Sequence, residues 1–174
     1  MNASVGRESV LAYWLLPAAA AREFFQTTIG RLAAGCDAPV FEPHLTLGIG
    51  PDLLDDAQRR LRGVAAGPIE LRAGGIDFTA KFTQTLFVRF DSNPSLENLR
   101  DSLGLAGGGA FDPHVSLLYK KMPADKQAQL AAVVRLPFQT VWFDALQVVR
   151  CRLPVATPAD VASWEVVVSH RLKA

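Results

Sequence analysis

The stretch Asp112–Lys120 reads DPHVSLLYK and sets a histidine two residues before a serine, between apolar positions. Nearly the same arrangement occurs earlier, where Glu42–Gly50 reads EPHLTLGIG. Two of the three histidines in the chain, His44 and His114, therefore share one sequence setting. Side chains alternate between the two faces of a strand, so each histidine is expected to share a face with the hydroxyl residue that follows it. The repeated pattern predicts a duplicated fold built around two such strands.

The elements around the two histidine stretches follow one another in a similar order twice. Apolar spacing predicts a strand, a helix, the histidine strand, a helix and further strands. The expected strands are 10–16, 40–47, 69–78, 81–90, the second histidine stretch, 140–149 and 164–172, and expected helices begin near Pro17, Leu54, Leu96 and Pro123. This order predicts an α+β protein in which residues 1–174 form a single bilobal domain, with internal repeats at approximately 10–90 and 91–174.

The composition is that of an ordinary globular protein, with 49% hydrophobic and 20% charged residues. Its 18 basic and 17 acidic residues give a net charge of +1, which argues against an extended nucleic-acid surface. Cys36 and Cys151 form neither a C-x-x-C pair nor a zinc spacing, and we expect them to be reduced. The apolar run Val10–Ala21 resembles a secretory signal, but Pro17 interrupts it. No stretch reaches transmembrane length, so we expect a cytoplasmic protein without a membrane partner.

Two histidine strands lying side by side would form a cleft with two imidazoles and with the hydroxyls of Thr46 and Ser116. Histidine titrates near neutral pH, so one imidazole can act as a general base and the other as a general acid. The hydroxyls can donate hydrogen bonds to an anion held between them. These groups suit in-line attack on a phosphodiester without a metal or another cofactor.

Two other interpretations of the histidines remain open at this point. A single histidine on a half-buried strand is often structural. A metal site would need a third ligand, and only Glu42 and Asp112 accompany the histidines on the same strand faces.

The paired P-H-x-[ST]-x stretches resemble the 2H phosphoesterase superfamily, which is named for its two H-x-[ST]-x motifs. The segments YWLLP (13–17), FTQTLFVRF (82–90) and HVSLLY (114–119) are similar, in order and spacing, to the cyclic phosphodiesterase branch of that superfamily. The resemblance covers nearly the whole chain beyond its first residues. It implies a duplicated bilobal fold of two antiparallel sheets, flanked by helices and separated by a central cleft.

The resemblance also implies roles for individual residues. It makes two histidines catalytic and three hydroxyl residues phosphate-binding, namely His44 and His114, and Thr46, Ser116 and Tyr119. Tyr119 matches a tyrosine that closes over the phosphate, and Trp14 matches, more weakly, an aromatic residue near the nucleotide that is a candidate for stacking on the substrate. A structural role also fits both aromatic residues, Tyr119 as a packed strand residue and Trp14 as a core residue of a buried strand.

The family implies a cyclic phosphodiesterase that hydrolyses nucleoside 2',3'-cyclic phosphates or ADP-ribose 1'',2''-cyclic phosphate to monophosphates. We therefore expect a monomer whose partner is a small cyclic-phosphate nucleotide. The alternatives are an enzyme that acts on the 2',3'-cyclic phosphate ends of RNA or forms 2'-5' linkages, and a non-catalytic nucleotide-binding module. His170 lacks the motif and is expected at the surface or at a strand end. Gln84 lies in a family-like segment without an assigned role.

Overall fold

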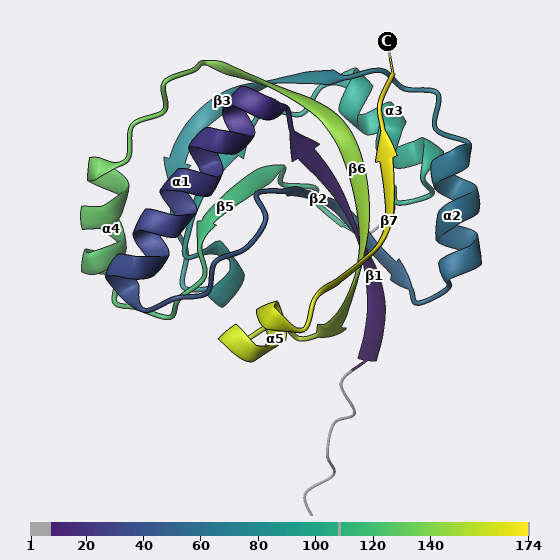
Figure 1. The fold of residues 1–174 in the computed structure, drawn as a ribbon. Coiled ribbons are helices and arrows are strands. Elements are labelled where there is room, and N and C mark those ends of the chain that lie inside the picture. The colour runs from purple at the N-terminus through teal and green to yellow at the C-terminus, as the bar shows by residue number, and fades with distance from the viewer. Residues whose placement is uncertain (1–7, 108, 174) are drawn as a thin grey trace, which may run out of the picture.

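The computed structural model describes residues 8–107 and 109–173, in which strands and helices alternate along the chain (Figure 1). The strands are β1 (Glu8–Pro17), β2 (Leu45–Pro51), β3 (Ile69–Asp77), β4 (Leu86–Phe90), β5 (His114–Leu118), β6 (Thr140–Leu153) and β7 (Glu165–Arg171). The helices are α1 (Ala19–Cys36), α2 (Leu54–Arg62), α3 (Pro94–Ser102), α4 (Ala124–Val133) and α5 (Pro158–Ala162), with a single 3-10 turn, η1 (Phe82–Gln84). The expected α+β class is confirmed.

The strands pair antiparallel in the order β1-β2-β5-β4-β3-β6-β7, and β6 also pairs with β1. The first six strands of this order therefore close into a ring. Strand β7 pairs with β6 on the edge opposite β1, next to β3. Two groups of strands can still be distinguished, β1, β2, β6 and β7 on one side and β3, β4 and β5 on the other. The groups meet where β3 pairs with β6 and where Leu45 of β2 pairs with Val115 of β5. The two expected sheets are thus hydrogen-bonded to each other, and the division into two sequence repeats stays a prediction.

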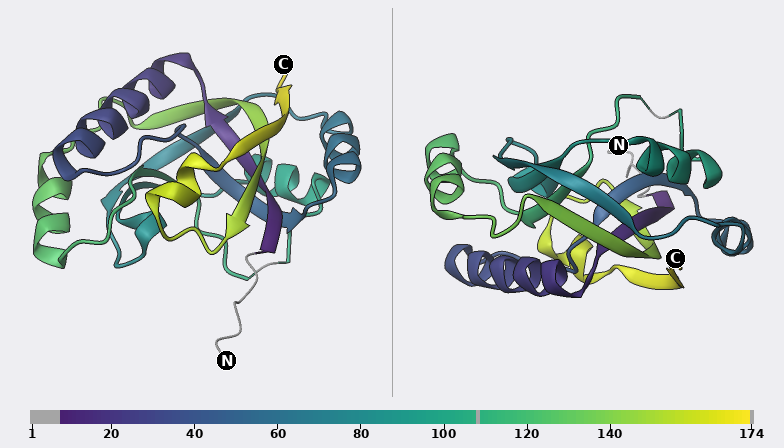
Figure 2. Two further views of the ribbon diagram at one scale, coloured as in Figure 1. Left: turned by 60° about the horizontal axis from the view of Figure 1, so that its bottom comes forward. Right: turned by 90° about the horizontal axis from the view of Figure 1, so that it is seen from above.

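The helices cover the outside of the strands at two ends of the molecule. In every view α1 and α4 lie at one end, and α2 and α3 lie at the other (Figure 1, Figure 2). Helix α1 buries Phe25, Ile29 and Leu32, which recur at helical spacing and pack into the core, as the sequence predicts. In residues 8–107 and 109–173, no helix is long and apolar enough to cross a membrane.

Two strands begin five residues later than the sequence predicts, and both differences shape the site. The first histidine strand was expected over 40–47 but begins only at Leu45, because Pro43 has no N–H to offer a strand partner. The strand expected over 81–90 begins only at Leu86, and residues 82–84 form η1 instead. Thr79 closes this turn by donating from its N–H and its hydroxyl to the Gln84 carbonyl, each over 3.0 Å. Helix α5 was not predicted.

Candidate active site

A cavity of about 480 Å³ lies where the two groups of strands meet. Five of the six residues expected at the site line it: Trp14, His44, Thr46, His114 and Tyr119. Ser116 does not line the cavity. The Leu45–Val115 pair explains how the motifs come together, since it joins the residues that follow the two histidines. Because the strands run antiparallel, this pairing brings Thr46 toward His114 and His44 toward Ser116.

His44 is held rigidly at the start of β2. Its Nδ1 donates to the backbone carbonyl of Glu42 over 2.6 Å, so in the neutral ring Nε2 is the proton acceptor. Its ring stacks on the indole of Trp14, with centroids 3.7 Å apart and planes at 11°. Trp164 approaches both rings edge-on. Only 6% of His44 is exposed to solvent, so it lies at the inner wall of the cavity.

Burial lowers the pKa of His44 from 6.5 to about 4. The hydrogen bond to the Glu42 carbonyl acts in the opposite direction, and the charge of a protonated His114 would add to the lowering. The desolvation of the imidazolium is the dominant cause, since a buried cation loses its hydration. His44 is therefore neutral in the free protein at pH 7.

We expect the stability of the protein to depend on pH through His44. As the pH falls from 6.5 toward 4, the unfolded chain binds a proton that the native His44 does not, so the stability that is complete above pH 6.5 is lost across this window. A pKa difference of this size corresponds to about 3 kcal/mol. Urea unfolding at pH 7 and pH 4 should therefore show a smaller loss for His44→Gln, which does not titrate, than for the unchanged protein. Equal losses in the two proteins would contradict the expectation.

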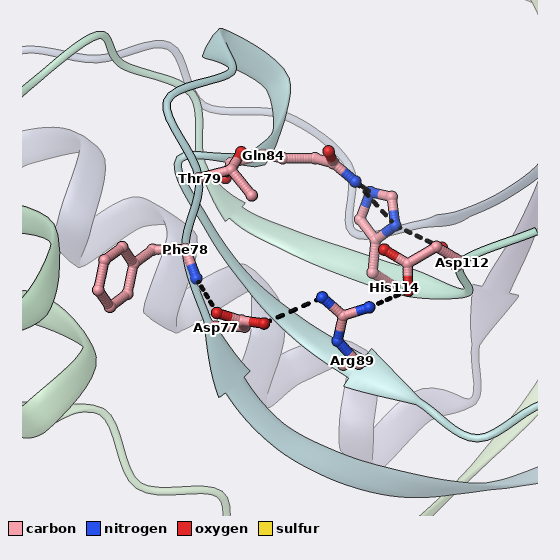
Figure 3. A network of polar contacts seen from close by, with 7 residues as sticks. All are labelled: Asp77, Phe78, Thr79, Gln84, Arg89, Asp112 and His114. Atoms are coloured by element: carbon pink, nitrogen blue, oxygen red, sulfur yellow. Dashed lines mark hydrogen bonds and ion pairs between the residues drawn. The ribbon is translucent and has the colours of Figure 1, made fainter. Parts of the chain in front are cut away.

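His114 repeats the local geometry of His44. Its Nδ1 donates to the backbone carbonyl of Asp112 over 2.7 Å, again two residues back and across a proline. Arg89 of β4 forms ion pairs with Asp112 and, over 2.9 Å, with Asp77 at the end of β3 (Figure 3). Burial lowers the pKa of His114, and Arg89 and Lys81 add to this, while the contacts with Asp112 oppose it.

The two hydroxyl residues of the motifs differ in what their side chains contact. Thr46 lines the cavity, and its hydroxyl has no hydrogen-bond partner in the part of the chain that the structure describes. Ser116 is buried, and its hydroxyl donates to the Thr83 carbonyl over 2.7 Å. Thr46 is thus free to bind a ligand, whereas the proton of Ser116 is already used within the protein.

Tyr119 lies just after β5, and its ring stacks on Phe41 with centroids 3.9 Å apart. Burial raises the pKa of Tyr119, and a hydrogen bond with Ser116 acts in the opposite direction, so the hydroxyl stays protonated. Trp14 has one face covered by His44 and is 4% exposed, so it acts first as the support of that histidine.

The cavity also contains residues that the sequence did not assign. Lys81 brings a cation, and Gln84 contacts His114. Trp164 contributes a second indole, half-buried, beside Trp14 and His44. One signal for Gln84 was that it is the only polar residue at the even-numbered positions of 82–90, which share one face of the expected strand. Lys81 and Trp164 carry no motif and become visible only through the fold.

The remaining candidates lie as follows. His170 is a half-buried residue of β7 and does not line the cavity. Cys36 ends α1 and Cys151 lines the cavity, and neither is in a disulfide. Residues 8–107 and 109–173 hold no group of three His, Cys, Asp or Glu side chains placed to bind a metal ion.

Comparison with known proteins gives the same fold and a family. The sequence matches the 2'-5' RNA ligase superfamily over residues 41–152, while no curated protein matches it. The structure of E. coli LigT complexed with 3'-AMP has 16% identity and a TM-score of 0.58, over 97% of this chain and 100% of LigT. TT0787 of Thermus thermophilus has 18% identity and a TM-score of 0.59, over 95% of this chain and 98% of its own. At these identities the structural likeness concerns the fold alone.

Proposed function

The chain belongs to the 2'-5' RNA ligase superfamily, and we propose that it is a cyclic phosphodiesterase that opens small cyclic-phosphate nucleotides by two-histidine acid–base catalysis. The substrates we propose are nucleoside 2',3'-cyclic phosphates, ADP-ribose 1'',2''-cyclic phosphate, or both. The observation that carries the proposal is the shared orientation of the histidines. Both line one cavity, and each donates its Nδ1 proton to a backbone carbonyl, so each keeps Nε2 for proton transfer.

In the proposed reaction His114 accepts a proton from water as the water oxygen attacks phosphorus. His44 donates a proton to the ribose oxygen as its bond to phosphorus breaks, which leaves a ribose hydroxyl and a phosphate monoester. For this His44 must be protonated in the complex. The negative charge of a bound phosphate favours the imidazolium, so binding of the substrate raises the pKa of His44 from its value of about 4.

The size and lining of the cavity support a ligand of nucleotide size. A volume of about 480 Å³ lies within the usual range for small-molecule sites. Its lining combines the histidines, Thr46 and Lys81 with apolar side chains such as Leu153, Val155 and Trp164. A ligand with a phosphate for the polar side chains and a ring for the apolar ones is a mononucleotide. Structures of E. coli LigT contain ATP or 3'-AMP, which are nucleotides as well.

The second candidate function is action on RNA ends, as the name of the family implies. A polynucleotide would be bound through several phosphates, and each contact makes affinity fall more steeply with salt. Lys81 is the one Lys or Arg side chain among the described residues that line the cavity. The charge around the site therefore favours the small substrate.

We expect a 2',3'-cyclic mononucleotide to be hydrolysed with a higher kcat/KM than an oligonucleotide that ends in a cyclic phosphate, and with little dependence on salt. Both substrates and ADP-ribose 1'',2''-cyclic phosphate are assayed across a salt series, with and without EDTA. A strong preference for the oligonucleotide with a steep salt dependence would support the RNA-end function. Loss of activity in EDTA that a divalent ion restores would contradict a mechanism without metal.

A further inference from the structure

We propose that Gln84 is a positioning residue for His114, whose side-chain amide holds the Nε2 of the neutral imidazole ready to accept a proton. The inference rests on the proposed function, because it assigns His114 the role of the general base. It also gives the turn η1 a task in the site.

Gln84 contacts the His114 ring directly, and the surrounding hydrogen bonds show which ring nitrogen carries the proton. The Gln84 Nε2 lies 3.1 Å from Nε2 and 3.3 Å from Nδ1 of His114 (Figure 3). The Asp112 carbonyl can only accept, so Nδ1 of His114 must carry a proton. Nε2 of the neutral ring then has a free lone pair. Because the distances to the two ring nitrogens are nearly equal, the amide of Gln84 lies over the face of the ring and not in line with this lone pair, which stays available for a proton.

The turn that carries Gln84 is anchored at several points. Thr79 donates twice to the Gln84 carbonyl, and Ser116 donates to the carbonyl of Thr83. The buried side chain of Gln127, in α4, donates to the Thr79 carbonyl over 2.7 Å. Ser116 thus fixes the backbone beside Gln84, so the turn that positions the Gln84 amide against His114 is rigidly held.

The Thr85 hydroxyl ties the same turn to the chain beyond β5. It donates to the carbonyl of Lys120 over 2.7 Å and accepts from the N–H of Lys120 over 2.9 Å. Bonds on both sides of Gln84 limit its freedom, and a preorganised donor costs little conformational entropy when it binds.

The charged and titratable groups that face His114 are Asp112 and Arg89 beside its ring, Lys81 before η1, and His44 across the cavity. Gln84 adds no charge to this set. It acts only through the contact of its amide N–H groups with the ring face, which disfavours the positive charge of a protonated imidazole. A base that must be neutral before it acts benefits from such a donor.

The test is an NMR titration of the His114 ring, combined with the pH dependence of kcat/KM. Gln84→Met keeps the length of the side chain but removes the donor, so the pKa of His114 should rise, and Gln84→Glu should raise it further by adding a negative charge. In Gln84→Met, kcat/KM should fall about 2- to 10-fold on the acid side of the profile and approach the unchanged protein at high pH. Gln129→Met, at an exposed position of α4, is the matched control and should change neither quantity.

A pKa of His114 that stays the same or falls in Gln84→Met would overturn the inference, as would a loss of activity that is equal at all pH values. If Gln84→Met does not fold, Gln84→Glu, which keeps the size of the side chain, decides alone by the direction of its pKa shift. The titration needs no substrate. A protein that hydrolyses no cyclic phosphate but shows the expected shift would therefore refute the proposed function, while the effect of Gln84 on the pKa of His114 would stand.

Discussion

Replacing either His44 or His114 by alanine is expected to lower kcat/KM for a cyclic-phosphate substrate by about 10²–10⁴-fold, the usual contribution of a general acid or base. Both rings line the cavity and have Nδ1 bonded to the backbone, so in the proposed mechanism each supplies a proton-transfer group that no other described side chain of the site replaces. The double variant should be only slightly less active than the less active of the two single variants, because in the proposed mechanism the two histidines act in one step.

His170→Ala is the matched control for this prediction. His170 is the third histidine of the chain and lies in β7, paired with Leu146, outside the cavity. The His170→Ala variant should retain full activity. Because His44 is buried against Trp14, each variant must also be shown to be folded, for example by its urea unfolding curve. A folded His44→Ala or His114→Ala that keeps near-normal hydrolysis would contradict the two-histidine mechanism.

The parts of the site that the sequence predicts are those that follow from strand periodicity. His44 and Thr46 lie two residues apart, and so do His114 and Ser116, so the alternation of a strand was enough to associate them. The apolar residues between them, such as Leu45 and Val115, are fully buried, as expected. A repeated local pattern is visible without the fold because each copy is made by neighbours in the chain.

What the sequence could not predict depends on contacts between distant segments. Gln84 was expected on a strand, and the turn that redirects it is closed by bonds to Thr79, Ser116 and Gln127, which no local pattern reveals. The closure of the ring by β1 and β6 is a second example, since this pairing joins Glu8 to Leu153. Likewise the stacking of Trp14 on His44 requires the register in which Trp14 lies opposite Thr46.

The second large loss of activity is expected on replacing Thr46, because the two hydroxyl residues of the motifs have different surroundings. Thr46→Val keeps the shape of the side chain and removes a hydroxyl that faces the cavity and has no partner among the described residues. We expect kcat/KM to fall about 10²-fold, as when one hydrogen-bond donor to a developing negative charge is removed. The free energy of unfolding should change little, because no hydrogen bond within the described protein is lost.

Ser116→Ala is the comparison that separates binding of phosphate from support of the turn. Its hydroxyl donates to the Thr83 carbonyl and bonds with Tyr119, so its loss leaves buried polar groups without a partner and should cost about 1–3 kcal/mol of stability. The loss of activity should be smaller than in Thr46→Val, and the acid limb of the pH profile should move, because the turn that carries Gln84 is loosened. Measuring urea unfolding and the pH dependence of kcat/KM for both variants decides the matter. If Ser116→Ala is as stable as the unchanged protein and loses as much activity as Thr46→Val, then Ser116 binds the phosphate directly, as the family resemblance implies.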